Sequence, residues 1–211
     1  MKKIIMRSLI AAAIALSAST SANAQLSNVL GNALSKVSSS SSNSTLSTIA
    51  GVITSKLVPT SSQIVGTWAY QEPAIMFTSS NVLKSTAASV VTKSVETKLQ
   101  SYLTKLGITK GNLTITFDAD KNFNIKLKNK QVASGTYAIS NNDVTLTFKG
   151  RSQPCKVTPQ LDNGTLVIVM DATKLKTFFQ NIGSNVSYLS TITSLLKQVD
   201  GMKVGLRLSK Q

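Results

Sequence analysis

Residues that could carry out chemistry are scarce in this chain. It contains no histidine, so the most common general base and the most common metal ligand are both absent. The two glutamates, Glu72 and Glu96, fall near a predicted strand end and on a predicted helix. Cys155 is the single cysteine, so it can form no internal disulfide, and no histidine can activate it. We therefore predict a protein that is not an enzyme and has no catalytic residue, metal or cofactor, with Cys155 as a small buried hydrophobe.

One acidic motif still requires interpretation. The run Asp118–Asn122 resembles the start of an EF-hand calcium loop, but positions six and twelve would be Phe123 and Asn129 instead of glycine and glutamate. A glycosidase pair would need one carboxyl group whose pKa is raised by burial, whereas a turn would point Asp118 and Asp120 into water. The pattern favours an Asx-rich hairpin turn.

The charge of the chain is strongly positive. It has 23 Lys and Arg against 8 Asp and Glu, a net charge of +15. Such a surface favours an anionic envelope component, for example a phosphorylated glycolipid or an acidic polysaccharide. The lysines are scattered, however, so a merely solvated surface is the other interpretation. Nucleic acid is not an expected partner, because Phe123 has the opposite strand parity from Lys126 and Lys128.

The first 24 residues have the pattern of a secretory signal peptide. A basic start precedes the apolar core Leu9–Leu16 and the small-residue cleavage site Ala22–Ala24. The apolar core is too short to cross a bilayer. We expect a periplasmic or secreted product that is not membrane-spanning and begins at Gln25.

Residues 25–62 form a separate Ser-rich segment. Apolar residues recur at helical spacing over Leu26–Val37 and again over Leu46–Leu57, and Pro59 follows the second stretch. We interpret 25–62 as weakly helical, and 63–211 as the globular domain.

The domain begins with a strand over Ile64–Tyr70 that Pro73 interrupts and Ala74–Thr78 resumes. Residues 81–106 have the apolar stripe of a long helix, and Gly107 caps it. The period then changes to that of strands joined by hairpins, with turns predicted at Asn141-Asn142 and Asp162–Gly164. The predicted elements are strands 113–117, 123–127, 132–140, 143–149, 153–159 and 165–170, short helices 175–182 and 186–199, and a last strand 202–208. Asp171 is the predicted cap of the first short helix.

This order predicts an α+β, mainly β, fold. Consecutive hairpins give an antiparallel meander, which either stacks as a sandwich or closes as a barrel. The first and last strands are placed as a closing pair would be, so we expect a barrel. One long helix is inserted after the first strand, and two short helices precede the last.

Two stretches carry a resemblance to a known family. Gly66-Thr67-Trp68 looks like the Gly-x-Trp opening of lipocalins and other calycins, and 135–148 is similar to a hairpin of small lipocalin-like domains. The layout of about residues 62–209 resembles an uncharacterised lipocalin-like family of exported Bacteroidetes proteins. In lipocalins a late arginine packs over that tryptophan, so the resemblance implies Arg207 as the barrel-closing partner of Trp68. The strand alternation of 202–208, however, turns Arg207 outward.

The aromatic residues of the predicted strands are the candidate binding residues. Trp68 and Tyr70 share a strand face and either line a cavity or plug the barrel floor. The full ligand-binding set is Trp68, Tyr70, Phe117, Phe123, Tyr137 and Phe148. Phe178-Phe179 is interpreted either as a tip facing a membrane or partner, or as helix packing.

Two functions follow from this interpretation. The first is non-catalytic binding of a small apolar or amphiphilic ligand in the barrel mouth. The alternative is a cell-envelope interaction protein with a filled barrel, which binds an anionic glycan or a protein partner through its basic surface. An interior large enough for a ligand, roughly 300–1,000 Å³, separates the two.

Overall fold

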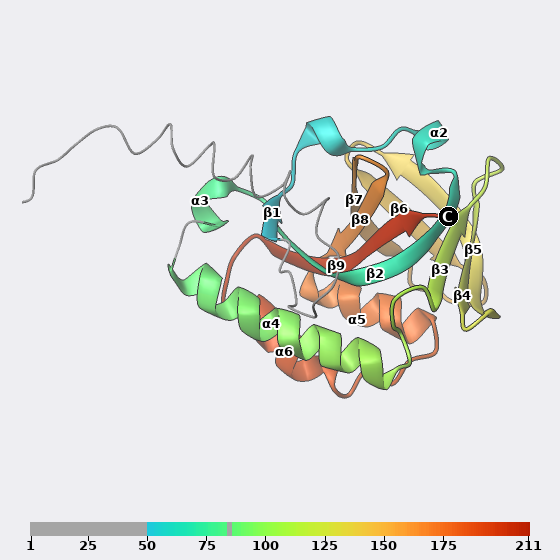
Figure 1. Cartoon of the computed structure of the whole chain (residues 1–211). Helices are drawn as coiled ribbons and strands as arrows, with labels where there is room; N and C mark the ends of the chain where they lie inside the picture. Colours follow the sequence, from blue (N-terminus) through green and yellow to red (C-terminus); the bar gives the residue numbers. More distant parts are fainter. Residues whose placement is uncertain (1–49, 84–85) are drawn as a thin grey trace, which may run out of the picture. The chain divides into compact units, whose positions relative to one another are not determined.

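Antiparallel strands in meander order form a closed barrel (Figure 1). The computed structural model describes residues 50–83 and 86–211, and in that part of the chain the sheet has nine strands. Strand β9 pairs with both β8 and β2, so β2 to β9 close on themselves and β1 is added at an edge. The predicted meander and its closing pair are confirmed. The strands are β1 (Ala50–Val52), β2 (Gly66–Phe77), β3 (Leu113–Phe117), β4 (Asn122–Leu127), β5 (Lys130–Ser140), β6 (Asp143–Phe148), β7 (Cys155–Asp162), β8 (Thr165–Met170) and β9 (Met202–Lys210).

The hairpin turns use the residues that the sequence indicated. Asn141 has φ 55°, and Asn163 and Gly164 have φ 45° and 76°. Asparagine and glycine tolerate this left-handed region, which tight hairpins require. The predicted turns at Asn141-Asn142 and Asp162–Gly164 are therefore confirmed.

Strand β2 runs through Pro73 without the predicted interruption. Residues on both sides of Pro73 pair with β9, and a bulge falls between Tyr70 and Glu72. Strand β3 pairs with β2 only over Gly66–Ala69, so at Pro73 the edge of β2 that faces away from β9 has no β3 partner. Proline has no backbone N–H, and a strand edge without a partner needs none. The predicted break at Pro73 is therefore wrong.

The described part of the N-terminal segment packs on the outside of the barrel. Strand β1 lies parallel to the end of β2, and a 3-10 turn, η1 (Ser55–Leu57), and the short helix α2 (Ser61–Ile64) follow. The helix predicted up to Leu57 is therefore wrong from Ala50 onward. Ile53 packs instead on the sheet, against an outward-facing cluster formed by Ala74, Met76, Val167 and Val169. The signal peptide and residues 25–49 lie outside the described residues.

Helices gather beside β2 and β9, and the three longer ones contribute buried side chains to the barrel core (Figure 1). They are α3 (Ser80–Leu83), α4 (Thr86–Lys105), α5 (Ala172–Asn181) and α6 (Leu189–Leu196). Asp171 caps α5, as its position before the apolar stripe predicted. Phe178 and Phe179 are both buried, against Phe148 and Tyr102 respectively, so helix packing is the interpretation confirmed for this pair. No helix in the described ranges is long and apolar enough to cross a membrane.

The β8–β9 seam supplies a test of the barrel. A Cβ atom at Gly205 would lie 1.8 Å from the carbonyl oxygen of Ile168 in β8. We expect Gly205→Ala to lower the free energy of unfolding by about 2–3 kcal/mol, because the two strands must separate. Urea unfolding followed by circular dichroism measures this.

Gly150→Ala is the matched control. Nothing lies within 4 Å of its added Cβ, and only its φ of +74° is unfavourable. We expect a cost of about 1–2 kcal/mol there. A Gly205→Ala protein as stable as the wild type would contradict the close pairing of β8 with β9 at this position.

Candidate functional site

Trp68 is buried in the barrel core. Its side chain is 1% exposed, and its indole Nε1 donates a hydrogen bond to the Ile64 carbonyl oxygen at 2.8 Å. The Nζ of Lys210 lies 5.5 Å from the ring centroid, within cation–π range. Lys210 stands directly opposite Trp68 in the β2–β9 register.

Arg207 does not take the position that the lipocalin resemblance implied. It pairs with Glu72 in the register, and its Nε lies 3.6 Å from Glu72 Oε1. Burial lowers the pKa of the Arg207 guanidinium, against the opposing charges of Glu72 and Asp162. The cation over Trp68 is Lys210 because the inward alternation of β9 turns Arg207 outward.

The predicted ligand-binding residues lie together in the barrel core. All six are at most 3% exposed: Trp68, Tyr70, Phe117, Phe123, Tyr137 and Phe148. Two pairs of these rings meet edge to face, with centroids 5.1 Å apart for Phe117–Tyr137 and 5.0 Å apart for Phe123–Phe148. Such contacts fill an interior with rings. Their role in ligand binding stays a prediction.

Cys155 is buried in the same core, as predicted. Its thiol donates to the Lys174 carbonyl oxygen at 3.5 Å. Burial raises the thiol pKa to about 12, more than the nearby Lys174 charge lowers it. The group is therefore neutral at physiological pH and unsuited to act as a nucleophile.

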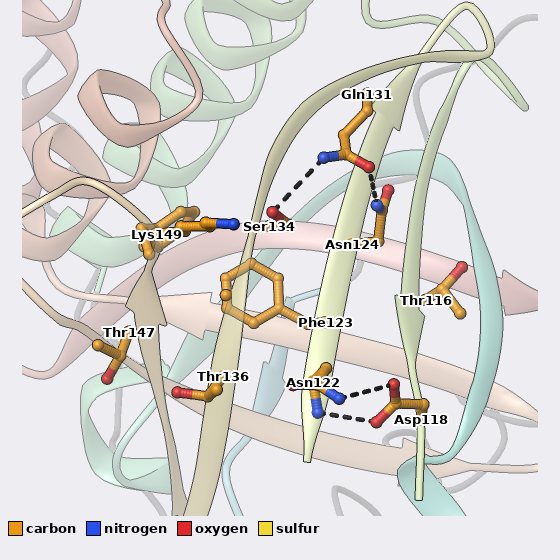
Figure 2. Close-up of a pocket in the computed structure, with 12 residues that line it drawn as sticks. Thr116, Asp118, Asn122, Phe123, Asn124, Gln131, Ser134, Thr136, Thr147 and Lys149 are labelled. Atoms are coloured by element: carbon orange, nitrogen blue, oxygen red, sulfur yellow. Dashed lines mark hydrogen bonds between the residues drawn. The ribbon is translucent and has the colours of Figure 1, made fainter. Parts of the chain in front are cut away.

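A polar groove of about 580 Å³ lies on the outer face of strands β3 to β6 (Figure 2). The register builds it, because Asn122 opposes Thr136, which opposes Thr147, and directly paired residues point to the same face. The lining residues are Thr116, Asp118, Asn122, Phe123, Asn124, Gln131, Ser134, Gly135, Thr136, Thr147, Phe148 and Lys149.

Gly135 brings the groove close to the aromatic core. It pairs with Phe123 on one side and Phe148 on the other. A Cβ atom there would lie 1.9 Å from the Thr147 carbonyl oxygen and 3.0 Å from the Phe123 ring. Only glycine permits this close approach of β5 to β6 and to the Phe123 ring.

Asn124 holds an unsatisfied acceptor in the groove. Its Nδ2 donates to Gln131 Oε1, and Gln131 Nε2 donates to Ser134 Oγ at 3.5 Å (Figure 2). Its Oδ1 is buried and has no hydrogen-bond partner among the described residues. Leaving a buried acceptor unpaired costs about 1–3 kcal/mol. A ligand hydroxyl or amide would remove that cost.

The Asp118 carboxylate is engaged by the β3–β4 turn. It accepts hydrogen bonds from Asn122 N at 2.8 Å and from Asn122 Nδ2 at 3.1 Å. Tyr137 Oη donates to the Asp118 carbonyl oxygen at 2.7 Å, and burial, with the Asp118 charge, raises the Tyr137 pKa. These contacts are those of the predicted Asx-rich turn. The described residues contain no group of three His, Cys, Asp or Glu placed to hold a metal ion.

A smaller lysine pocket, of about 190 Å³, lies between β6, β7, α5 and the start of β9. Its lining residues are Asp143, Lys156, Thr158, Met170, Asp171, Lys174 and Lys203. Lys203 Nζ donates to Thr158 Oγ1 at 2.8 Å, and Thr158 Oγ1 donates to Asp143 Oδ1 at 2.7 Å. Lys156 Nζ pairs with Asp143 Oδ2 at 2.9 Å.

Sequence reasoning missed both polar sites. It considered only the inward-facing residues of each strand, which include the aromatic ones. The outward half of β3 to β6 consists of Thr, Asn, Ser and Gln with few charges, and that composition was the available signal.

Two comparisons with known proteins gave a match. A family model described as "Lipocalin-like domain (DUF4923)" matches residues 38–210. Among solved structures, a DUF4847 family protein from Bacteroides vulgatus is similar, at 11% identity, over 70% of this chain and 95% of that chain, with a TM-score of 0.33. No curated protein matches.

The lysine pocket predicts a pH-dependent contribution to stability. Burial alone would raise the Asp143 pKa, but hydrogen bonds from Lys156 and Thr158 and the charges of Lys156 and Lys203 lower it overall. The lowered pKa stabilises the fold above the unfolded value of about 3.9, and this stability is lost as pH falls through the folded pKa. Asp143→Asn should cost about 1 kcal/mol at neutral pH and nothing at a pH below both pKa values.

Urea unfolding at neutral pH and at about pH 2 tests this, with the exposed turn residue Asp120→Asn as control. A cost of Asp143→Asn that persists unchanged at the acid pH would contradict the assignment.

Proposed function

Because this chain belongs to the lipocalin-like domain family, we propose that it is an exported, non-catalytic binding protein whose outer groove binds an anionic glycan of the cell envelope. Export, to the periplasm or the exterior, rests on the signal-peptide pattern of residues 1–24. The observation that carries the proposal is the unpaired Oδ1 of Asn124 in a groove of amides and hydroxyls.

The chemistry of the groove suits a sugar chain. Asn and Gln side chains both donate and accept, and Ser and Thr hydroxyls do the same, so together they can match the hydroxyl groups of a saccharide. Of the twelve lining residues, Asp118 and Lys149 are charged, and Asp118 is held by its turn. The polar side chains of the groove therefore supply hydrogen bonds, and the preference for an anionic chain has to come from the positive charge around it.

The charge of the whole chain supports an anionic glycan. Its net charge is +15, or +12 without the three cations of the leader. A positive field raises the local concentration of anionic partners, and the effect weakens as salt screens it. Lys149 in the groove adds a local cation.

A small apolar or amphiphilic ligand in the barrel mouth is the second candidate. The lipocalin-like description of the family and the six buried aromatic residues favour it. Such a ligand would have to displace ring contacts such as Phe123–Phe148, which makes the outer groove the better supported site.

Calorimetry with residues 25–211 tests the proposal. Polygalacturonate is the anionic probe, and dextran the neutral one. We expect binding of polygalacturonate that weakens with salt, and at least about a tenfold loss in Asn124→Leu, which removes the groove amide. Thr97→Leu, at an exposed position on α4, is the control and should bind as the wild type does.

Equal affinity of Asn124→Leu and wild type would contradict the groove as the site. Binding of neither polysaccharide would contradict the glycan proposal and leave a protein partner or an interior ligand.

A further inference from the structure

The outer face of β6 connects the groove to the lysine pocket. Thr147 and the adjoining Lys149 line the groove, and Asp143 lines the pocket. Thr145 lies between them on the same outward row and pairs with Lys156 of β7. Thr147 follows Asp143 by four positions, about 13 Å along β6. One extended molecule can therefore contact both sites.

The lysine pocket carries an excess of positive charge. Lys156, Lys174 and Lys203 face two carboxylates, Asp143 and Asp171. Asp143 already accepts from Lys156 and Thr158. Asp171 Oδ1 accepts from the backbone N–H of Lys174 as the cap of α5, at 2.9 Å. Both acids are engaged, and the lysines retain donor capacity because each ammonium group carries three hydrogens.

One of the lysines is held in place by a buried group. Thr158 is 4% exposed, and it accepts from Lys203 Nζ while donating to Asp143. This chain of hydrogen bonds orients the ammonium group of Lys203 before any ligand arrives. Preorganised donors lose less entropy on binding than free surface lysines do.

A phosphate monoester matches this arrangement best. It carries a charge of about −1.5 to −2 and three strong acceptor oxygens, whereas a carboxylate offers one charge and two oxygens. Three lysines line a hollow of about 190 Å³, so there are enough ammonium groups to serve all three oxygens. The N-terminus of α5, a helix of ten residues, adds a favourable dipole at the same place.

We propose that the groove and the lysine pocket form one continuous binding track, in which the pocket takes a phosphate monoester group of the glycan that lies in the groove. This inference rests on the proposed function and names its ligand class. Inorganic phosphate shares the same chemistry, so the test must separate a free anion from one attached to sugar.

Calorimetry with residues 25–211 and three probes makes this distinction. The probes are a phosphomannan oligosaccharide, the same oligosaccharide after phosphatase treatment, and inorganic phosphate. We expect the phosphorylated oligosaccharide to bind at least about tenfold more tightly than either of the others. Lys203→Met should remove that preference, and Lys174→Met should reduce it.

The exposed Lys98 on α4 gives a matched control, since Lys98→Met removes the same charge away from the track. Urea unfolding of each variant establishes that it is folded. The inference is overturned if phosphatase treatment leaves the affinity unchanged, or if folded Lys203→Met keeps the preference. It is also overturned if inorganic phosphate binds as tightly as the phosphorylated oligosaccharide.

These outcomes are distinct from failure of the proposed function. If the dephosphorylated oligosaccharide binds equally well and Asn124→Leu weakens it, the glycan groove stands and the phosphate pocket does not. If neither the phosphomannan oligosaccharides nor polygalacturonate binds, both fail.

Discussion

Pairing of β2 with β9 is the constraint on which the rest of the structure depends. It closes the sheet and gives every strand from β2 to β9 an inner and an outer face. Closure also removes the exposed edges that an open meander would have. Once the inner face is defined, the aromatic residues of β2 to β6 must fill it, and the amides and hydroxyls of β3 to β6 must point outward. The groove and the lysine pocket are consequences of that division.

The interior and the exterior of the barrel carry different chemistry. Inside, the rings of Phe123 and Phe148 meet edge to face, and the ring of Phe178 from α5 lies against Phe148. Outside, Gly135 lets β5 approach β6 and the Phe123 ring, and the neighbouring polar side chains form a groove. The binding proposed for this outer groove would use the Asn124 acceptor, which has no hydrogen-bond partner among the described residues.

Local signals in the sequence predicted the elements well. Alternation located the strands, Asn-Asn and Asn-Gly located turns, and Asp171 located the start of α5. Signals that depend on distant partners were not predictable. Pro73 could remain within β2 only because β3 ends its pairing at Ala69, and Ala50–Val52 became a strand because the end of β2 offered an edge. The cation over Trp68 depends on the β2–β9 register, which selects Lys210. The groove combines residues from four strands, so no single segment of the sequence predicts it.

Native mass spectrometry of the chain, purified from its source without detergent, tests the filled barrel most directly. The account predicts that no apolar molecule accompanies the protein, because the buried aromatic rings of the core contact one another instead. A bound apolar or amphiphilic molecule of defined mass that is lost on denaturation, and that Asn124→Leu does not affect, would contradict it and place the ligand among the interior aromatic residues.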